Sequence, residues 1–398
     1  MRSVLAAIFC AFFIAPSFAA EYSPAQFTPA TIRAIQANEV VVLKDGTYNI
    51  TDARRNALED LPNGVTIKAK NRHKAVLRET GSSTRVIEFT NKDGIDIDGI
   101  HFQNIALWFK SCDDIDVRWN KFDSFEDKTY DIRNAIIDVQ NSEDTNIYRN
   151  NILWKDNTEN NATYRGSQNK FLGNVVGIQI KNGQGGKHSI SNNTVKGYLR
   201  TAIRYWSNYN TKQKFGIIKN NTCERYVAAP DSTSTKKFED HGLYVLFGSN
   251  LRIFNNTVKG WSASSSGGSL KIKWYNVAEI TANQFHNSGI LFRNKLDNLY
   301  VFDNNMINTG PWAAQFYHTS SSETITGLYF AENNLGGSSL LMSWTSLITS
   351  GQLNSDVEKI SGSIAGAVVD NSNGTLNVPF GTRYATSFKN NGMTVNKF

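Results

Sequence analysis

The sequence predicts an all-β fold in which the chain winds into a single-stranded solenoid of short parallel strands. A motif of the form apolar-x-x-Asn-x-apolar recurs along the chain, with its asparagines roughly 19 to 35 residues apart. The segments between these asparagines are short, rich in β-strand formers and without helical periodicity. A motif repeated at such a period is typical of a solenoid in which each repeat forms one turn.

The N-terminus has the composition of an export signal. Arg2 precedes an apolar run, and Ser17-Phe18-Ala19 provides a small-x-small cleavage site. We therefore expect residues 1–19 to be a signal peptide, residues 20–398 to be one β-helix domain including its caps, and the protein to be secreted or periplasmic. The apolar run is too short to span a bilayer and no later segment is longer, so we expect no membrane insertion.

A short amphipathic helix over Pro29–Gln36, the strand Val40–Leu43 and a turn at residues 44–48 come before the repeats. Such a helix is suited to covering the first open edge of a solenoid. From about Ser355 the asparagine rhythm fades into a segment that we expect to be the C-terminal cap. The nine repeat units are Val117–Phe122, Ile147–Ile152, Phe171–Val176, Ile190–Val195, Ile218–Cys223, Ile253–Val258, Ile280–Phe285, Val301–Met306 and Phe330–Leu335.

The asparagine of each unit is expected at an inward turn, because asparagine tolerates left-handed backbone and its amide can bind the asparagine of the next turn. Two cysteines remain after cleavage, Cys112 and Cys223. They are about four turns apart, roughly 19 Å at one strand spacing per turn, whereas a disulfide needs Cα atoms within about 7 Å. We therefore predict two unpaired thiols that fill the core.

A second set of strands between the asparagine turns places two outward side chains on each turn. Aligned on the small residue before each strand, the first outward row is Glu88, Trp108, Asp138, Gln179, Arg204, Tyr244, Lys271, Leu291 and Gln315. The second row is Thr90, Lys110, Gln140, Lys181, Trp206, Leu246, Lys273, Arg293 and Tyr317. Cations and aromatic residues concentrate along this strip.

The helix, the strand with its Asp-Gly-Thr-Tyr turn, and the asparagine-marked coils together resemble the right-handed parallel β-helix superfamily of pectate lyases and polygalacturonases. The resemblance extends from about residue 29 to residue 335. It implies the same right-handed parallel β-helix here, and an enzyme that acts on an acidic polysaccharide.

The formal net charge of +7 independently favours an anionic partner. Basic residues are scattered singly among aromatic ones and do not form runs, which suits an acidic polysaccharide and argues against nucleic acid. We expect a monomer. No histidine has metal-ligand spacing, so no metal or other cofactor is assigned.

Lys271, Lys273 and Arg293 on neighbouring turns form the candidate active site, because like charges side by side cost stability unless a ligand offsets them. Removing the weakly acidic hydrogen beside the carboxylate of a uronate requires a base and cations that stabilise the enolate. Lys273 is the candidate base if its neighbours lower its pKa from about 10.4. Arg293 would hold the carboxylate, and Tyr244 or His241 would protonate the leaving oxygen.

The segment VAEITANQFHNSGILFRN after Lys273 is similar to the one that joins the catalytic lysine and arginine in the family of chondroitinase B and the β-helical alginate lyases. That resemblance implies β-elimination, with Lys273 as the base and Arg293 assisting as an acid. In place of the acidic calcium ligands of that family, residues 268–271 read Gly-Ser-Leu-Lys, so the sequence requires no calcium, although calcium stays an open alternative, and Lys271 would replace the charge of the metal. Further substrate-binding candidates on either side of the cluster are Arg204, Trp206, Lys181, Lys110, Tyr317 and His318.

Three other functions remain open. His241-Gly242 and Leu270–Lys273 are similar to motifs of polygalacturonases, but hydrolysis needs paired carboxylates, and the turns just before carry Gln179, Lys181, Arg204 and Trp206. A uronate epimerase would share the proton abstraction. A binding module that only reads polysaccharides would need the aromatic residues but not a lysine base.

Overall fold

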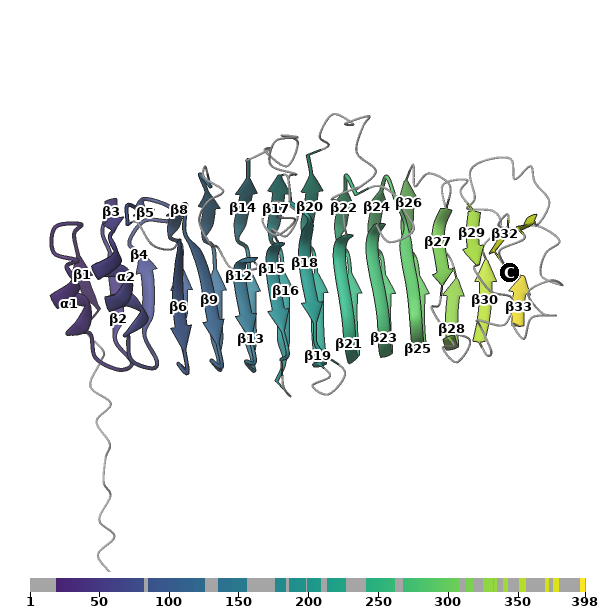
Figure 1. The fold of residues 1–398 in the computed structure, drawn as a ribbon, viewed down its shortest axis with the longest axis horizontal. Coiled ribbons are helices and arrows are strands. Elements are labelled where there is room, and N and C mark those ends of the chain that lie inside the picture. Colours follow the sequence, from purple (N-terminus) through teal and green to yellow (C-terminus); the bar gives the residue numbers. More distant parts are fainter. Residues whose placement is uncertain are drawn as a thin grey trace, which may run out of the picture.

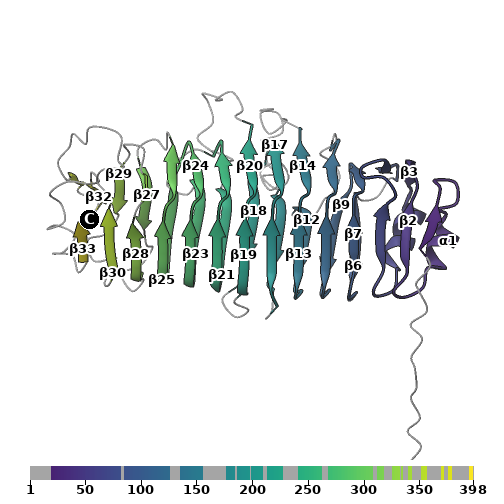
Figure 2. The same cartoon turned by 180° about the vertical axis from the view of Figure 1, so that it is seen from behind.

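The chain forms an elongated solenoid of parallel strands, which confirms the predicted β-helix (Figure 1). The strands stand side by side across the long axis, with the first helix and the last strands at opposite ends, as the reverse view also shows (Figure 2). The computed structural model describes residues 19–81, 85–125, 135–155, 176–183, 186–197, 199–208, 213–226, 241–261, 268–307, 312–317, 325–331, 333–334, 339–342, 351–355, 369–371, 375–378 and 394–397.

The first face of the solenoid carries the predicted outward rows. Its strands are β6 (Val86–Thr90), β9 (Ala106–Lys110), β12 (Ala135–Gln140), β15 (Val176–Lys181), β18 (Thr201–Trp206), the first halves of β21 (His241–Phe254), β23 (Gly268–Thr281) and β25 (Ile290–Phe302), then β27 (Trp312–Tyr317) and β29 (Ser339–Met342).

The second face continues from the first. It consists of β1 (Ala20–Tyr22), β2 (Val40–Leu43), β4 (Thr66–Ala69), β7 (Asp96–Asp98), β10 (Ile115–Arg118), β13 (Thr145–Tyr148), β16 (His188–Ser191), β19 (Gln213–Lys219), the second halves of β21, β23 and β25, then β28 (Ile325–Ala331), β30 (Gly351–Ser355) and β33 (Thr394–Lys397). The first and second faces join into one sheet because β21, β23 and β25 pass through both.

The third face closes the coil. Its strands are β3 (Gly46–Ile50), β5 (Ala75–Glu79), β8 (His101–Gln103), β11 (Lys121–Asp123), β14 (Asn151–Trp154), β17 (Thr194–Gly197), β20 (Thr222–Arg225), β22 (Thr257–Lys259), β24 (Gln284–His286) and β26 (Asn305–Ile307).

Single left-handed residues bend the long strands between the first and second faces. Phe247, Trp274 and Asn294 have φ values of 51°, 49° and 62°. The rings of Phe247 and Trp274 stack at this bend, with centroids 4.6 Å apart. The bend therefore turns each strand from one face to the next without ending it.

The interior is filled by identical positions of successive turns stacked on one another. One buried column on the second face runs through Ile97, Val117, Ile147, Ile190, Ile218, Ile253, Ile280 and Val301. Aromatic residues stack in the same way, since the rings of Phe89 and Phe109 have centroids 5.1 Å apart. Apolar side chains at most inward positions fix the strand register, because a one-residue slip would expose them.

The predicted asparagine ladder is present at the turn between the second and third faces. Each amide nitrogen donates to the amide oxygen of the next asparagine at 2.9–3.2 Å, along Asn120, Asn150, Asn193, Asn221, Asn256, Asn283, Asn304 and Asn333. The Asn150 amide donates to Asn193, and the predicted unit at residues 171–176, with its Asn174, lies outside the described residues except for Val176.

The ladder also corrects the expected backbone conformation. The left-handed residue is the one before each ladder asparagine, for example Trp119, Arg149 and Asn192, with φ of 57–58°. The ladder asparagine points inward, where its amide nitrogen also donates to a main-chain carbonyl, as Asn120 does to Ile97 at 2.9 Å.

Two short helices lie near the N-terminal end. Helix α1 covers Pro29–Arg33, shorter than the predicted range, and begins at the N-cap Thr28; its role as a cap stays a prediction. Helix α2, Asp52–Glu59, begins at the N-cap Thr51 and was missed by the sequence analysis. Near the C-terminus, β32 (Thr375–Val378) pairs antiparallel with β29 and with β31 (Val369–Asn371), and the boundaries of the domain and its C-terminal cap also stay predictions.

Cys112 and Cys223 are both buried and unpaired, as predicted. Burial raises the pKa of both thiols. They therefore act as small core residues in this fold, not as reactive groups.

Candidate active site

The two outward rows of the first face have the register expected from the sequence. Each residue of row one is the register partner of the next, from Glu88 with Trp108, through Tyr244 with Lys271, to Leu291 with Gln315. The same holds for row two, from Thr90 with Lys110, through Lys273 with Arg293, to Arg293 with Tyr317. The faces alternate as expected because the residue between the two rows is a buried apolar one, aliphatic or aromatic, from β6 to β25.

Lys271, Lys273 and Arg293 lie together on adjacent strands, as predicted. Lys273 is the direct register partner of Arg293, and Lys271 is that of Tyr244. The ammonium groups of Lys271 and Lys273 lie 5.2 and 6.0 Å from the centroid of the Tyr244 ring, and Lys273 also lies 4.5 Å from that of Trp274. The aromatic rings thus present electron-rich faces to both ammonium groups.

This cluster, named here the basic cluster (Lys271, Lys273, Arg293 and Tyr244), is only partly open to solvent. Lys271 is 6% exposed, whereas the other three members are half-buried. A half-buried cation interacts with an anion more strongly than one in bulk water, because water screens it less. The geometry brings the four side chains together, and their catalytic roles stay predictions.

Several outward positions are covered, which the sequence did not reveal. His241, the other candidate proton donor, is fully buried and packs beside Tyr244, with ring centroids 5.2 Å apart. Leu291 is likewise fully buried. Tyr244 is therefore the better placed of the two candidate proton donors.

A buried polar network continues row one away from the basic cluster. Asp138 is fully buried and accepts hydrogen bonds from the amides of Gln179 at 2.8 Å and Gln140 at 3.0 Å. The Gln179 oxygen accepts from Trp206 Nε1 at 2.8 Å and from Arg204 Nη1 at 3.3 Å. The network fixes the orientation of two predicted substrate-binding residues, Arg204 and Trp206.

Burial raises the pKa of Asp138 to about 6, although the bonds from Gln179 and Gln140 favour the carboxylate. The sequence analysis placed Asp138 and Gln179 in row one but gave them no function. The sequence did show that Asp138 and Gln179 precede Arg204 in row one, which is the pattern of a polar network. It did not show that this part of the first face is buried.

The remaining candidates extend along the same face. The ammonium group of Lys181 lies 4.8 Å from the Trp206 ring centroid, and that of Lys110 lies 5.7 Å from the Trp108 ring centroid. Lys110 is five strands from Lys273, about 24 Å at one strand spacing each, so it is not part of the basic cluster. The backbone of Tyr317 pairs with Arg293, but its side chain and all of His318 lie outside the described residues.

In the described part of the chain, no group of three or more His, Cys, Asp or Glu side chains is arranged to hold a metal ion. None of the helices there is long and apolar enough to cross a membrane.

Neither a protein-family model nor a curated protein sequence matches the chain. Its fold is similar to that of alginate lyases of polysaccharide lyase family 6. One, solved in complex with a trisaccharide, is 13% identical, with 95% of this chain and 96% of that one covered and a TM-score of 0.49. A mannuronic acid specific family 6 lyase from human gut microbiota is 13% identical, with 95% and 91% covered and a TM-score of 0.46.

The A-module of a mannuronan C-5 epimerase from Azotobacter vinelandii is also similar, at 10% identity and a TM-score of 0.40, with 82% of this chain and 92% of that one covered. Identities of this size describe the fold, so the activity is argued below from the site.

Proposed function

We propose that the protein is a polysaccharide lyase that cleaves a uronate-containing, alginate-like polymer by β-elimination. The observation that carries the proposal is the direct pairing of Lys273 with Arg293, next to Lys271, on one face of the solenoid. From β18 to β25 the two described rows hold four cations and no carboxylate, namely Arg204, Lys271, Lys273 and Arg293. Four cations on neighbouring strands supply the positive charge that recognition of a carboxylate-bearing polymer requires.

The reaction starts with the carboxylate of a uronate held by Arg293 and Lys271. Arg293 suits this role because its planar guanidinium can bind a carboxylate through two hydrogen bonds. Neutral Lys273 takes the proton from the carbon that bears the carboxylate, and the two cations stabilise the negative charge that develops on the carboxylate oxygens.

Elimination then breaks the glycosidic bond. The electron pair left by the proton forms a carbon–carbon double bond, and the glycosidic oxygen leaves from the adjacent ring carbon. Tyr244 donates a proton to that oxygen, and the ammonium groups near its ring stabilise the tyrosinate that results. The products are a new chain end and an unsaturated uronate, and no water is consumed.

A hydrolase is less well supported by this arrangement. Glycoside hydrolysis uses two carboxyl groups about 5 to 9.5 Å apart across the scissile bond. The nearest carboxylate of row one, Asp138, is four strands from Lys271, about 19 Å at one strand spacing each. The basic cluster therefore lacks a carboxylate pair in the two rows that form it.

Incubation of the purified protein with a panel of uronate polymers tests the proposal. The ultraviolet absorbance of unsaturated ends and the number of reducing ends are measured in parallel. We expect both to rise in proportion, and most strongly with alginate. Reducing ends without absorbance would show a hydrolase, inverted sugars without new ends would show an epimerase, and bound but unchanged polymer would show a binding module. The variant Lys259→Ala, which removes an exposed cation of the third face, serves as a control that keeps full activity.

A further inference from the structure

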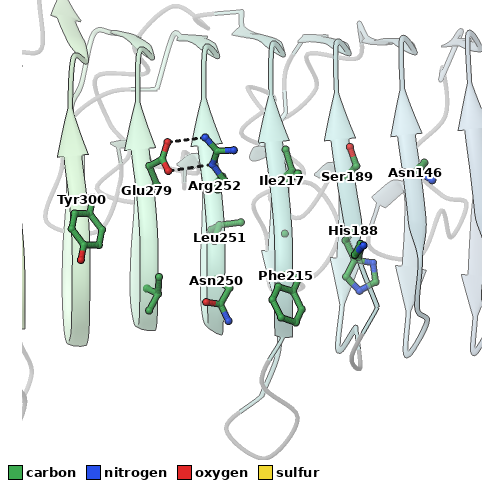
Figure 3. Close-up of a pocket in the computed structure, with 13 residues that line it drawn as sticks. Asn146, His188, Ser189, Phe215, Ile217, Asn250, Leu251, Arg252, Glu279 and Tyr300 are labelled. Carbon is green, nitrogen blue, oxygen red and sulfur yellow. Dashed lines mark hydrogen bonds and ion pairs between the residues drawn. The ribbon is translucent and has the colours of Figure 1, made fainter.

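A trough of roughly 640 Å³ crosses the second face, away from the basic cluster (Figure 3). Its sides are two rows of successive turns. One is the outward row of the second face, Asn146, Ser189, Ile217, Arg252, Glu279 and Tyr300. The other is formed by the residues just before the inward ones, Lys187, Phe215, Asn250 and Val277. The trough thus runs along the solenoid axis and perpendicular to the strands.

Two residues of the second row are unusual in both conformation and exposure. Phe215 and Val277 have left-handed backbone, with φ of 50° and 58°, which a bulky or β-branched residue rarely adopts. Other turns have Asn250 or Asn298 at this position, residues that tolerate the conformation well. Phe215 and Val277 are also 50% and 37% exposed. Strained backbone that holds apolar side chains in solvent indicates a surface selected for contact.

A buried imidazole lies beneath the trough. His188 is 2% exposed, lines the trough, and has no hydrogen-bond partner for either ring nitrogen among the described residues. Gly216, its register partner on the next strand, contributes no side chain there. Burial lowers the pKa of His188 to about 4, so the ring is neutral at physiological pH. A neutral imidazole has one donor and one acceptor, and the described residues use neither.

The shape and chemistry of the trough favour a chain of sugar rings. It reaches from β13 to β25, five strand spacings or about 24 Å, which suits a linear polymer. Phe215 and Tyr300 present rings that are 50% and 46% exposed, and sugar rings have apolar faces that stack on such surfaces.

The polar residues at the trough suit the same ligand. Asn146, Ser189 and Asn250 offer groups for hydroxyls, and Figure 3 shows the ion pair between Arg252 and Glu279 at its edge. The charges of Arg252 and Glu279 cancel. Lys187 therefore gives the described lining a net positive charge, which complements an acidic polymer.

We propose that the trough is a second binding site, which holds a linear uronate polysaccharide outside the catalytic cluster; the choice of a uronate rests on the proposed function. Val277 follows Lys273 on β23 by four residues, about 13 Å along the strand, with the bend at Trp274 between them. A long polymer can therefore occupy both sites, while a short one reaches only one. The second site keeps the polymer at the enzyme between cleavages.

The test compares the native chain with the double variant Phe215→Asn/Val277→Asn. Asparagine is the residue that other turns use at this position, so the melting temperature is expected to stay equal or to rise. Tyr300→Ser is a second variant that leaves the strained positions intact. Asn298→Gly is the matched control, because it changes the same row on β25 at a residue that does not line the trough, and glycine accepts its φ of 53°.

Binding to alginate, polygalacturonate and a neutral xylan is measured by affinity electrophoresis, which needs no turnover. We expect the native chain and Asn298→Gly to be retarded by an acidic polymer, and the two trough variants to bind it about tenfold more weakly. If the lyase proposal also holds, KM rises for long polymer and stays unchanged for a trisaccharide. Equal binding by all four proteins, or no retardation of the native chain by any polymer, would overturn the inference.

The same four proteins also distinguish a dimer interface from a binding site, and the binding site from the proposed lyase activity. A native chain that elutes as a dimer, with the double variant as a monomer, would show that the trough is an interface between copies and would overturn the inference. Retardation of the native chain that is lost in the trough variants, in the absence of any lyase activity, would support the binding site while refuting the proposed function.

Discussion

Replacing Asn150 by alanine tests the asparagine ladder, which fixes the turn between the second and third faces. The Asn150 side chain is 1% exposed and takes part in four hydrogen bonds. Its amide nitrogen donates to the Val117 carbonyl at 2.8 Å and to Asn193 Oδ1 at 3.0 Å. Its oxygen accepts from the main-chain nitrogen and the amide of Asn120, at 3.0 and 3.2 Å.

These bonds determine the size of the expected effect. At about 1 kcal/mol for each buried hydrogen bond, the loss of four lowers the free energy of unfolding by about 4 kcal/mol. Some partners keep other bonds, since the Asn120 amide still donates to Ile97 and Asn193 Oδ1 still accepts from the main-chain nitrogen of residue 150. The Val117 carbonyl loses the bond from Asn150, which adds a desolvation cost.

The neighbouring residue supplies the control. Asn151 is exposed at the start of β14, so Asn151→Ala is expected to change the free energy of unfolding by less than about 0.5 kcal/mol. Both variants are compared with the native chain by urea unfolding, followed by circular dichroism and by tryptophan fluorescence. Similar effects of the two substitutions, within about 1 kcal/mol, would refute the view that the ladder is a main stabilising element of the turn.

Three further predictions concern charge and thiols. Arg293→Lys keeps the charge but loses the two-point grip on a carboxylate, so kcat/KM on the preferred polymer should fall about tenfold or more, and an unchanged value would argue against this role. The pKa of Asp138 is raised by burial from about 4 to about 6, so its contribution to stability is full below about pH 4 and is lost as pH rises to 6, about 3 kcal/mol in all. The melting temperature of Asp138→Asn, relative to the native chain, should therefore increase between pH 4 and pH 6, and parallel pH profiles would contradict the assignment. Thiol titration should find Cys112 and Cys223 unreactive until the protein is unfolded, with no effect of reductant on the melting temperature; a loss of stability on reduction would reveal a disulfide instead.

The strand register could be predicted from the sequence because it depends on local alternation. Ile137 and Val139 flank Asp138 in β12, and the same apolar alternation recurs turn after turn, so the pairing of Lys273 with Arg293 followed from counting. The ladder was found for the same reason, since asparagine keeps a fixed offset from its apolar neighbours.

Other features depend on segments far apart in the sequence and could not be predicted in this way. Burial of the row-one residues Asp138 and Leu291 is set by what covers the face, which strand alternation does not encode. The trough on the second face was also missed, since its apolar residues are spread over turns whose alignment becomes visible only in the structure.

The most direct test of the central claim is the initial rate of unsaturated-end formation by native protein and by Lys273→Ala on the best uronate polymer. If Lys273 removes the proton, the variant keeps its circular dichroism spectrum and binds polymer, but forms no unsaturated ends, and an added small primary amine restores part of the rate. A variant that produces unsaturated ends at the native rate would contradict the account.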